Sequence, residues 1–296
     1  MNLTRRELLA TMATTLEARS SGSRPVLAAQ FYVWTQHFQS RKMTLAEGVE
    51  EALAATRRAG FKRVELMSPF FQGAVREKTL VALKQHGLEV PIVYNGGPLH
   101  QPALAEKSIA DTLQLAGTVK SAGARIINFN PSPKPKRERK SDQELDTQAR
   151  YVNQLAAELD QRGLRLHLHH HDPEMAENAR EWRHLLASTN PKLVSICLDV
   201  HWVYRGQQDP MKLLEESGAR LGSLHLRNSK QSVWTEAFED GDLDYSKVAG
   251  YLKRTKFAGF LVVELAYEKS TAITRPLEED LRLSRLYAEK LFGVGS

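Results

Sequence analysis

The stretch Leu164–Glu174 decides the fold, and it reads L-R-L-H-L-H-H-H-D-P-E. Leucines occupy every second position up to Leu168, with one arginine and one histidine between them. A period of two predicts a β-strand with one apolar face. Pro173 lacks the backbone N–H that a strand ladder needs, so the strand has to end before it. Histidines therefore gather where a buried strand meets a loop.

Three later stretches end in a similar way. They read V-S-I-C-L-D-V-H-W (194–202), S-L-H-L-R-N (223–228) and L-V-V-E-L-A-Y-E (261–268). Each is typical of a buried strand whose last residues supply an aspartate, a histidine or a glutamate. Side chains at the ends of successive parallel strands can converge, and imidazole with carboxylate is a ligand set for divalent cations. The sequence therefore predicts one cation site at the ends of these strands.

Predicted strands and helices alternate along the chain after residue 24. A helix signal stands at Thr44, where Glu47 at the third helical position completes a capping box. The predicted strands cover 26–34, 61–67, 89–94, 125–130, 164–169, 193–200, 221–227 and 259–265. The predicted helices cover 44–58, a segment ending at 86, 102–121, 141–162, 174–188, 209–218, 244–256 and 276–293.

This alternation predicts an α/β fold, a (β/α)8 TIM barrel. Strict alternation indicates a parallel sheet with right-handed crossovers, and eight strand–helix units are the number that closes a barrel. A doubly wound open sheet is the alternative, but it needs a glycine-rich turn after the first strand, and residues 31–38 contain no glycine. We expect one barrel domain over 25–296, with its active site at the carboxyl ends of the strands.

Composition limits the classes of function. The chain has 296 residues and a formal net charge of +6, which does not indicate a nucleic-acid-binding protein and is equally compatible with an anionic small substrate. Its single cysteine, Cys197, excludes an intrachain disulfide and is predicted to be an inert core thiol. No apolar run approaches the roughly 20 residues that span a bilayer. We therefore expect neither a nucleic-acid partner nor a membrane partner.

The N-terminus carries a conflicting signal. The stretch T-R-R-E-L-L (4–9) resembles a twin-arginine export signal, whereas Glu17 and Arg19 interrupt the apolar segment that should follow. Residues 1–24 are interpreted as a leader or a disordered N-terminus. We expect a cytoplasmic protein, and the alternative is periplasmic export through a degenerate twin-arginine signal.

Four motifs between residues 166 and 264 carry a family resemblance that covers nearly all of 26–293. They are L-H-L-H-H-H-D-P-E-M (166–175), L-D-V-H-W (198–202), L-H-L-R-N (224–228) and G-D-L-D-Y with G-F-L-V-V-E (241–264). In this order and spacing the chain resembles the sugar phosphate isomerase/epimerase superfamily, which has a xylose isomerase-like TIM barrel. The resemblance implies a divalent ion (Mn, Zn, Co, Fe or Mg). The ligands that it implies are His169, Asp199, His225 and Glu264.

One position departs from the family pattern. Many sugar epimerases of this type have a glutamate where His169 stands, and their two metal-bound glutamates exchange protons on opposite faces of the substrate. Glu264 is then the principal metal-linked carboxylate here. The resemblance implies a sugar isomerase or epimerase that abstracts a proton next to a carbonyl. The alternative, favoured by His169, is a lyase or dehydratase acting on a keto-sugar, keto-glycoside or inosose. Apurinic-endonuclease-like nucleases and non-catalytic sugar-binding barrels are weaker alternatives.

Other polar and aromatic residues are predicted to lie near the same strand ends. Glu65, at the end of the second strand, is an acid/base candidate or a partner of a ligand. His171 is a catalytic candidate, and His171 and Glu174 are candidates for orienting His169. The expected substrate is a small carbohydrate, and a homo-oligomer is left open. Candidate substrate-binding residues are Trp34, Tyr94, Trp202, Arg205, Arg227 and Lys230.

The loop P-S-P-K-P-K-R-E-R-K (131–140) follows the fourth predicted strand on the same face. Its prolines keep it extended, and most of its other residues are charged. It is interpreted as an ordinary mobile surface loop, with a lid or an anion collector as the alternative.

Overall fold

Eight parallel strands close into a barrel in the order β1-β10-β7-β6-β5-β4-β3-β2. The structure is a computed structural model that describes residues 24–295. The predicted TIM barrel is confirmed, and the open sheet was wrong. The predicted leader lies outside the described residues, apart from Arg24. The barrel strands are β1 (Val26–Gln30), β2 (Arg63–Met67), β3 (Glu89–Gly97), β4 (Ile126–Pro131), β5 (Arg165–Leu168), β6 (Val194–Asp199), β7 (Leu221–Leu226) and β10 (Phe260–Val263).

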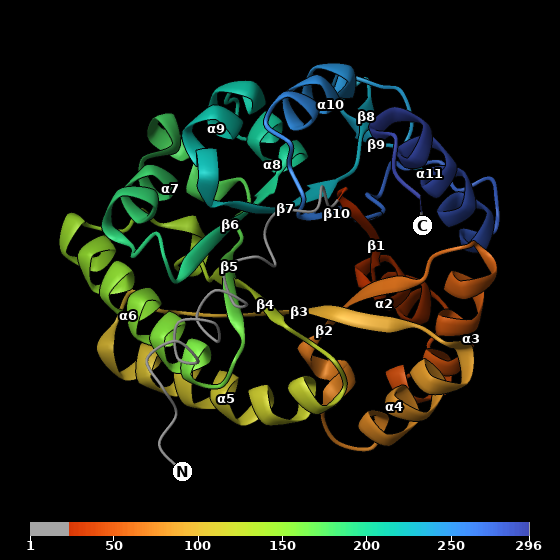
Figure 1. The fold of residues 1–296 in the computed structure, drawn as a ribbon, viewed down its shortest axis with the longest axis horizontal. Helices are drawn as coiled ribbons and strands as arrows, with labels where there is room; N and C mark the ends of the chain where they lie inside the picture. The colour runs from red at the N-terminus through yellow and green to blue at the C-terminus, as the bar shows by residue number, and fades with distance from the viewer. Residues whose placement is uncertain (1–23, 296) are drawn as a thin grey trace, which may run out of the picture.

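Helices form a ring around the barrel, as Figure 1 shows. Short 3-10 turns and a two-stranded hairpin fill loops between the strands and the helices. The helices are α2 (Tyr32–Ser40), α3 (Leu45–Arg58), α4 (Val75–His86), α5 (Pro102–Ser121), α6 (Asp142–Gln161), α7 (Ala176–Ser188), α8 (Val200–Arg205), α9 (Pro210–Ser217), α10 (Tyr245–Arg254) and α11 (Leu277–Phe292). The turns are η2 (Ser68–Phe71), η3 (Pro135–Arg137), η4 (Pro173–Met175) and η5 (Gly218–Arg220), and the hairpin strands are β8 (Ser229–Lys230) and β9 (Val233–Trp234).

Local sequence signals explain where several helices begin and end. The predicted capping box is present at the start of α3, where the Thr44 side chain accepts from the Glu47 backbone N–H and the Glu47 carboxylate accepts from the Thr44 N–H. Ser141 and Glu144 form a second capping box at the start of α6. Gly87 ends α4 in the left-handed conformation, with φ of 60°, which glycine adopts without steric cost.

The first strand is shorter than predicted. The apolar run at 26–34 was interpreted as one strand, but β1 ends at Gln30 and α2 begins at Tyr32. The Gln30 side chain accepts a hydrogen bond from the Tyr32 backbone N–H at this junction. A short apolar run does not by itself distinguish a strand from a buried helix, so this boundary could not be predicted from periodicity. Neither α8 nor the β8–β9 hairpin was predicted.

Apolar side chains fill two separate spaces. The larger cluster lies between the barrel and the ring of helices, and includes Leu166, Leu224 and Leu261 from the outer faces of three strands. A small second cluster, formed by Ala28, Ile92, Ile126 and Val262, packs among the strands. Alternation places Glu65, Asn128, Cys197, His225 and Glu264 on the inner faces of the strands. The inside of the barrel is therefore apolar in one layer and polar toward its mouth.

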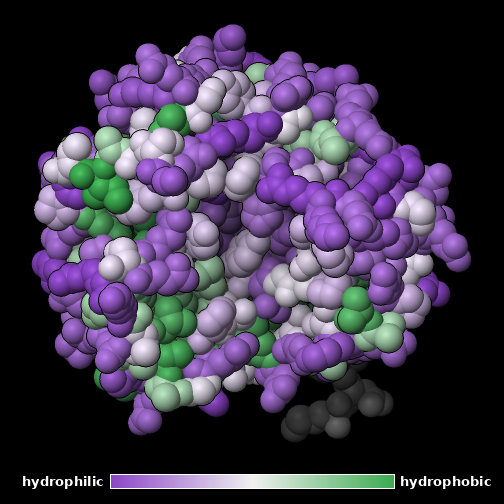
Figure 2. All heavy atoms as spheres, turned by 180° about the vertical axis from the view of Figure 1, so that it is seen from behind, coloured by the Kyte–Doolittle hydropathy of each residue, from purple (hydrophilic) through white to green (hydrophobic). Residues whose placement is uncertain are grey.

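The mouth that holds these polar residues faces the viewer in Figure 2. The chain proceeds clockwise around the barrel in Figure 1. Because parallel crossovers are right-handed, the carboxyl ends of the strands point away from the viewer in that view. Figure 2 shows the opposite face, which is hollowed at its centre and surrounded mainly by hydrophilic and neutral residues. Within residues 24–295, no helix combines the length and apolar character needed to cross a bilayer.

Candidate metal centre

The structure brings His169, Asp199, His225 and Glu264 together. One ligand atom from each side chain lies within 4.8 Å of the others, and all four residues are buried. His169 directly follows β5, Asp199 ends β6, His225 lies near the end of β7, and Glu264 directly follows β10. Asp199 and His225 are register partners on adjacent strands. Parallel strands carry their carboxyl ends to one edge, which explains why residues far apart in sequence meet here.

Asn130 at the end of β4 orients His169. Its Oδ1 lies 3.1 Å from His169 Nδ1, and because an amide oxygen only accepts, Nδ1 carries the proton. Burial is the main cause that lowers the pKa of His169, so the ring is neutral at neutral pH. Its Nε2 is buried with no hydrogen-bond partner among the described residues and lies 3.9 Å from Asp199 Oδ2. An unshared lone pair therefore faces the carboxylates.

His225 lies between two carboxylates. Its Nδ1 is 2.6 Å from Glu264 Oε2, and its Nε2 is 3.1 Å from the Glu65 carboxylate. Burial by itself lowers the pKa of His225, but the charges of Cys197, Glu65 and Glu264 together raise it well above its ordinary value. Glu65 thus contacts the opposite edge of the imidazole from Glu264. This contact gives Glu65 a positioning part in the site.

Arg227 connects the two carboxylates of the cluster. Its Nη2 lies 3.0 Å from Asp199 Oδ2 and 2.6 Å from Glu264 Oε2. Burial would raise the pKa of both carboxyl groups, but Arg227 and the neighbouring histidines together outweigh it: the pKa of Asp199 is held well below its ordinary value, and that of Glu264 is also lowered. Both side chains are therefore ionised at neutral pH and able to bind a cation.

The donor set fits a divalent metal ion. It combines two imidazole nitrogens with two carboxylates, a mixture that suits Mn, Zn, Co or Fe better than Ca. His169 offers Nε2, and its other nitrogen is already fixed by Asn130, the arrangement expected of a ligating histidine. His225 offers Nδ1 on the same side as Glu264, while Nε2 is held by Glu65. His169 thus has one nitrogen fixed by Asn130 and one facing the carboxylates, whereas both nitrogens of His225 meet a carboxylate.

An aromatic wall borders the cluster beside Arg227. The Arg227 Cζ atom lies 4.7 Å from the Trp234 ring centroid and 5.4 Å from that of Trp202. The two indoles meet edge to face at 5.4 Å between centroids. Arg227 Nε and Trp202 Nε1 are buried and have no hydrogen-bond partner in the part of the chain that the structure describes. Two buried hydrogen-bond donors at this wall therefore lack an acceptor among the described residues.

His171 lies at the same edge. Its ring contacts those of His169, at 4.9 Å, and Trp202, at 5.4 Å. Burial, followed by the neighbouring His169, lowers the pKa of His171 to about 3, which keeps it neutral. Its backbone N–H donates to Glu174 Oε2 at 2.9 Å. Glu174 therefore fixes the turn after β5, and Asn130, not His171 or Glu174, accepts the hydrogen bond from His169.

Three predicted substrate contacts lie elsewhere or are already engaged. Trp34 is on α2, not at a strand end, and its Nε1 donates to Thr56 Oγ1 at 3.0 Å in the layer between helices. Lys230 is exposed and pairs with Glu239 at 2.6 Å. Arg205 pairs with Glu268. The placement of Trp34 at the barrel mouth was wrong, because the chain turns into α2 directly after β1. Tyr94, in contrast, lies beside His169, with 5.3 Å between the ring centroids.

Sequence reasoning missed Asn128, Asn130 and Trp234. The two asparagines are two residues apart at the end of β4, so strand periodicity could have indicated that both face inward. Asn128 Nδ2 contacts Glu65 Oε1 at 3.3 Å and His225 Nε2 at 3.1 Å. Trp234 lies on the β8–β9 hairpin, for which the sequence contains no clear signal.

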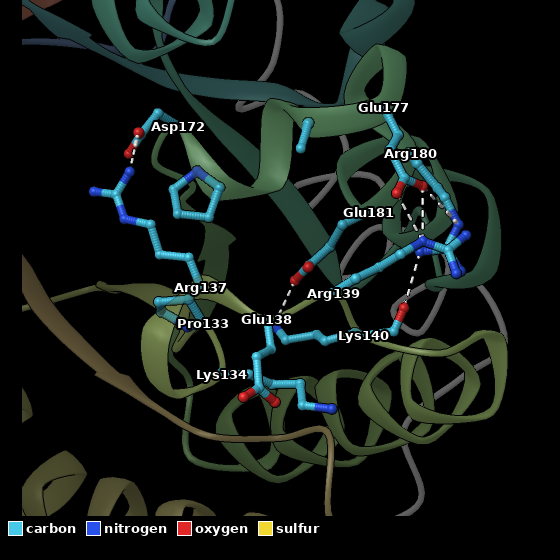
Figure 3. Close-up of a pocket in the computed structure, with 12 residues that line it drawn as sticks. Pro133, Lys134, Arg137, Glu138, Arg139, Lys140, Asp172, Glu177, Arg180 and Glu181 are labelled. Carbon is cyan, nitrogen blue, oxygen red and sulfur yellow. Dashed lines mark hydrogen bonds and ion pairs between the residues drawn. The ribbon is translucent and has the colours of Figure 1, made fainter.

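The loop 131–140 is held down by ion pairs, as Figure 3 shows. Arg137 pairs with Asp172, Arg139 with Glu177, and Lys140 with Glu181, at 2.6, 2.7 and 2.6 Å. These pairs join the loop to Asp172, directly before η4, and to α7 around a pocket of about 390 Å³. The three basic side chains already have carboxylate partners, which weakens the interpretation of the loop as an anion collector.

Comparison with known proteins supports the family and the fold. An inosose dehydratase of Clostridium perfringens is 28% identical over 169 residues, which are 51% of this chain and 56% of that protein. The chain thus spans about half the length of the curated relatives it matches. The solved structure of a D-allulose 3-epimerase from Methylomonas sp. has a TM-score of 0.75 at 14% identity and covers 91% of this chain and 98% of its own. A probable 3-DHS dehydratase of Bacillus anthracis has a TM-score of 0.66 at 14% identity, with coverages of 88% and 97%.

These solved structures share the fold, and their identities are too low to transfer an activity. The match to a family model is broader, because the model of the xylose isomerase-like TIM barrel covers residues 53–287. That range includes all four residues of the cluster and most of the barrel. The chain belongs to the xylose isomerase-like TIM barrel family.

Proposed function

We propose that the protein is a divalent-metal-dependent enzyme that removes a proton from the carbon next to the carbonyl of a small carbohydrate. The observation that carries this proposal is the meeting of His169, Asp199, His225 and Glu264 within 4.8 Å at the barrel mouth. These residues would hold the ion, which supplies electrophilic polarisation of a carbonyl or hydroxyl oxygen.

Glu264 is the proposed proton acceptor. It is ionised at neutral pH, because Arg227 and His225 counter the effect of its burial on its pKa. The carboxylate takes the proton from the α-carbon, and the C–H electron pair moves toward the carbonyl oxygen to give an enediolate. The unpartnered N–H groups of Arg227 Nε and Trp202 Nε1 are proposed to donate hydrogen bonds to oxygens of the substrate.

Isomerisation follows if Glu264 returns the proton to the neighbouring carbon. Epimerisation needs a second acid/base group on the opposite face of the substrate, and the corresponding position here is His169. Its Nδ1–H is engaged by Asn130, and its Nε2 would have no lone pair to spare if it held the ion. The site therefore favours a reaction in which one carboxylate moves the proton. We place isomerisation of an aldose–ketose type first.

Dehydration is the second candidate, and the similarity to an inosose dehydratase favours it. In that reaction the enediolate expels a hydroxyl group from the next carbon, and the hydroxyl leaves as water after accepting a proton. The same base and the same ion serve both reactions. The difference lies in which group receives the electron pair.

Solvent deuterium exchange tests the proposal. We expect the Mn²⁺-loaded protein to exchange deuterium into at least one member of a panel of ketoses, keto-glycosides and inososes. The loss of the exchanged proton signal in ¹H NMR measures this exchange. Glu264→Gln keeps an oxygen ligand but cannot take a proton, so exchange should be lost. Glu268→Gln is the matched control, since Glu268 pairs with Arg205 outside the cluster. Full exchange by Glu264→Gln would refute the assignment and leave Glu65 as the next candidate.

A further inference from the structure

A second group of potential ligands lies inside the barrel. One ligand atom each from His169, Cys197 and His225 lies within 4.8 Å of the others, and all three residues are buried. Cys197 precedes Asp199 by two residues on β6, so the two side chains are on the same inner face of that strand. Cys197 therefore lies one step deeper in the barrel than Asp199, beneath the mouth.

The sulfur lies on the opposite side of the His225 ring from Glu264. Asn128 Nδ2 contacts both Cys197 Sγ, at 3.3 Å, and His225 Nε2, at 3.1 Å. The thiol is thus next to the Nε2 edge of the imidazole, whereas Glu264 approaches Nδ1. His225 therefore presents Nδ1 toward Glu264, whereas its Nε2 meets Glu65 and Asn128 on the side where the sulfur lies.

A second observation points to a ligand at this place. His169 Nε2 is unpartnered among the described residues, and the His169 side chain is 1% exposed. The ring is fixed by its Nδ1 contact to Asn130, so the free nitrogen cannot turn toward another acceptor. It faces the space bordered by the carboxylates on one side and the sulfur on the other.

We propose that the barrel contains a deeper, alternative metal position formed by Cys197, His169 and His225, which binds thiophilic divalent ions such as Cd²⁺ or Zn²⁺. Thiolate with imidazole is a softer donor set than the imidazole–carboxylate set at the mouth, so it selects thiophilic ions over Mn²⁺. When the metal–sulfur bond forms, the thiol loses its proton to water, and the thiolate lowers the net charge of the site by one while the ion keeps its oxidation state. The inference rests on the proposed function, because both positions use the same two imidazoles.

Sharing makes the two positions mutually exclusive. His169 has one free nitrogen, so it can bind an ion at the mouth or an ion at the deeper position, but not both. An ion bound to Cys197 would lose the ligands Asp199 and Glu264. Thiophilic ions should therefore displace Mn²⁺ with one ion bound per chain, and they should inhibit proton transfer by Glu264.

Cadmium binding to the intact protein tests the proposal. Cys197 is the only cysteine in the chain, so a thiolate-to-metal charge-transfer band in the near ultraviolet reports on this residue alone. We expect stoichiometric Cd²⁺ to produce this band and to release one bound Mn²⁺. Electron paramagnetic resonance measures the released Mn²⁺. The ¹¹³Cd NMR shift of the wild-type protein should show one sulfur ligand, and this measurement needs no variant.

Cys197→Ser provides the matched variant, because a hydroxyl can still accept from Asn128. We expect loss of the band and a fall in Cd²⁺ affinity of about tenfold or more, with Mn²⁺ affinity changed by less than about threefold. A ¹¹³Cd shift without a sulfur ligand, while Mn²⁺ still binds, would overturn the deeper position and leave the proposed function intact. Failure of the wild-type protein to bind any of these ions would instead overturn the proposed function. Circular dichroism checks that the variant is folded.

Discussion

The Oδ1 atom of Asn130 lies 3.1 Å from His169 Nδ1, between the ends of the adjacent strands β4 and β5. This contact assigns the proton to Nδ1 and leaves Nε2 facing Asp199. The orientation of a central side chain of the cluster is therefore set by the neighbouring strand and not by the His-rich turn that carries it.

Asn130→Ala should weaken metal binding without unfolding the barrel. The imidazole of His169 would lose the acceptor that fixes its tautomer, and loss of such a partner typically lowers metal affinity about 10–100-fold. Mn²⁺ titration followed by electron paramagnetic resonance measures the change. Asn95→Ala is the matched control, because Asn95 hydrogen-bonds Thr112 on the helix side of β3. Equal affinities for the wild type and Asn130→Ala would contradict the assignment.

His169→Glu should add epimerisation to the activity of the protein. The variant places a second carboxylate at the end of β5, opposite Glu264, where it can exchange a proton with the other face of the substrate. NMR of products formed from a responsive ketose measures the outcome. His169→Gln, which cannot transfer a proton at neutral pH, is the control and should not epimerise. If both variants gave the same products, the residue at this position would not decide the reaction outcome.

Arg227→Lys should lower kcat/KM and shift the pH profile. Lysine cannot contact both Asp199 and Glu264 in the planar geometry of a guanidinium stacked on Trp234. A loss of about tenfold or more is expected, since one hydrogen bond to a charged group contributes about 1.5–3 kcal/mol. Because Arg227 lowers the pKa of Glu264, the acidic limb of the rate profile should move to higher pH in the variant.

Arg205→Lys is the control for this experiment. Arg205 also lies over the Trp234 ring, at 5.1 Å, but pairs with Glu268 and contacts neither carboxylate of the cluster. An acidic limb that moves equally in both variants would show that general charge, and not the contact to Glu264, sets the profile.

Glu174→Gln should flatten the pH dependence of stability. Burial, followed by the charge of Glu181, raises the pKa of Glu174 from 4.5 to about 8. Between these two values the native state binds more protons than the unfolded state, so the wild-type protein loses stability as pH rises through this window. The glutamine variant lacks this loss. Urea unfolding between about pH 5 and pH 9 measures it.

Glu177→Gln is the control, because Glu177 is half exposed and pairs with Arg139. A difference between wild type and Glu174→Gln that does not change with pH would refute the raised pKa. The same series of urea unfolding measurements should be repeated with Mn²⁺ present, since bound metal stabilises the folded state by mass action.

Much of the fold could be predicted from the sequence. The helix bounds at 102–121 and the capping box at Thr44 were confirmed, because both depend on local signals: apolar period, proline and glycine positions, and side-chain capping. The parallel barrel followed from the strand–helix alternation and from the handedness of crossovers. The four residues of the cluster could be nominated because parallel strands end at one edge, so their order along the chain indicates their meeting place.

Tertiary structure decided the details that depend on neighbours distant in sequence. Trp34 was misplaced because an apolar run has the same appearance in a strand and in a helix packed against α3. Asn130 and Glu65 position His169 and His225 through direct contacts, and such contacts depend on strand register. The sequence by itself determined which side chains point into the barrel, because alternation is a local property of the backbone. Which of those side chains touch was decided by the closure of the barrel, because closure sets the distances across its interior.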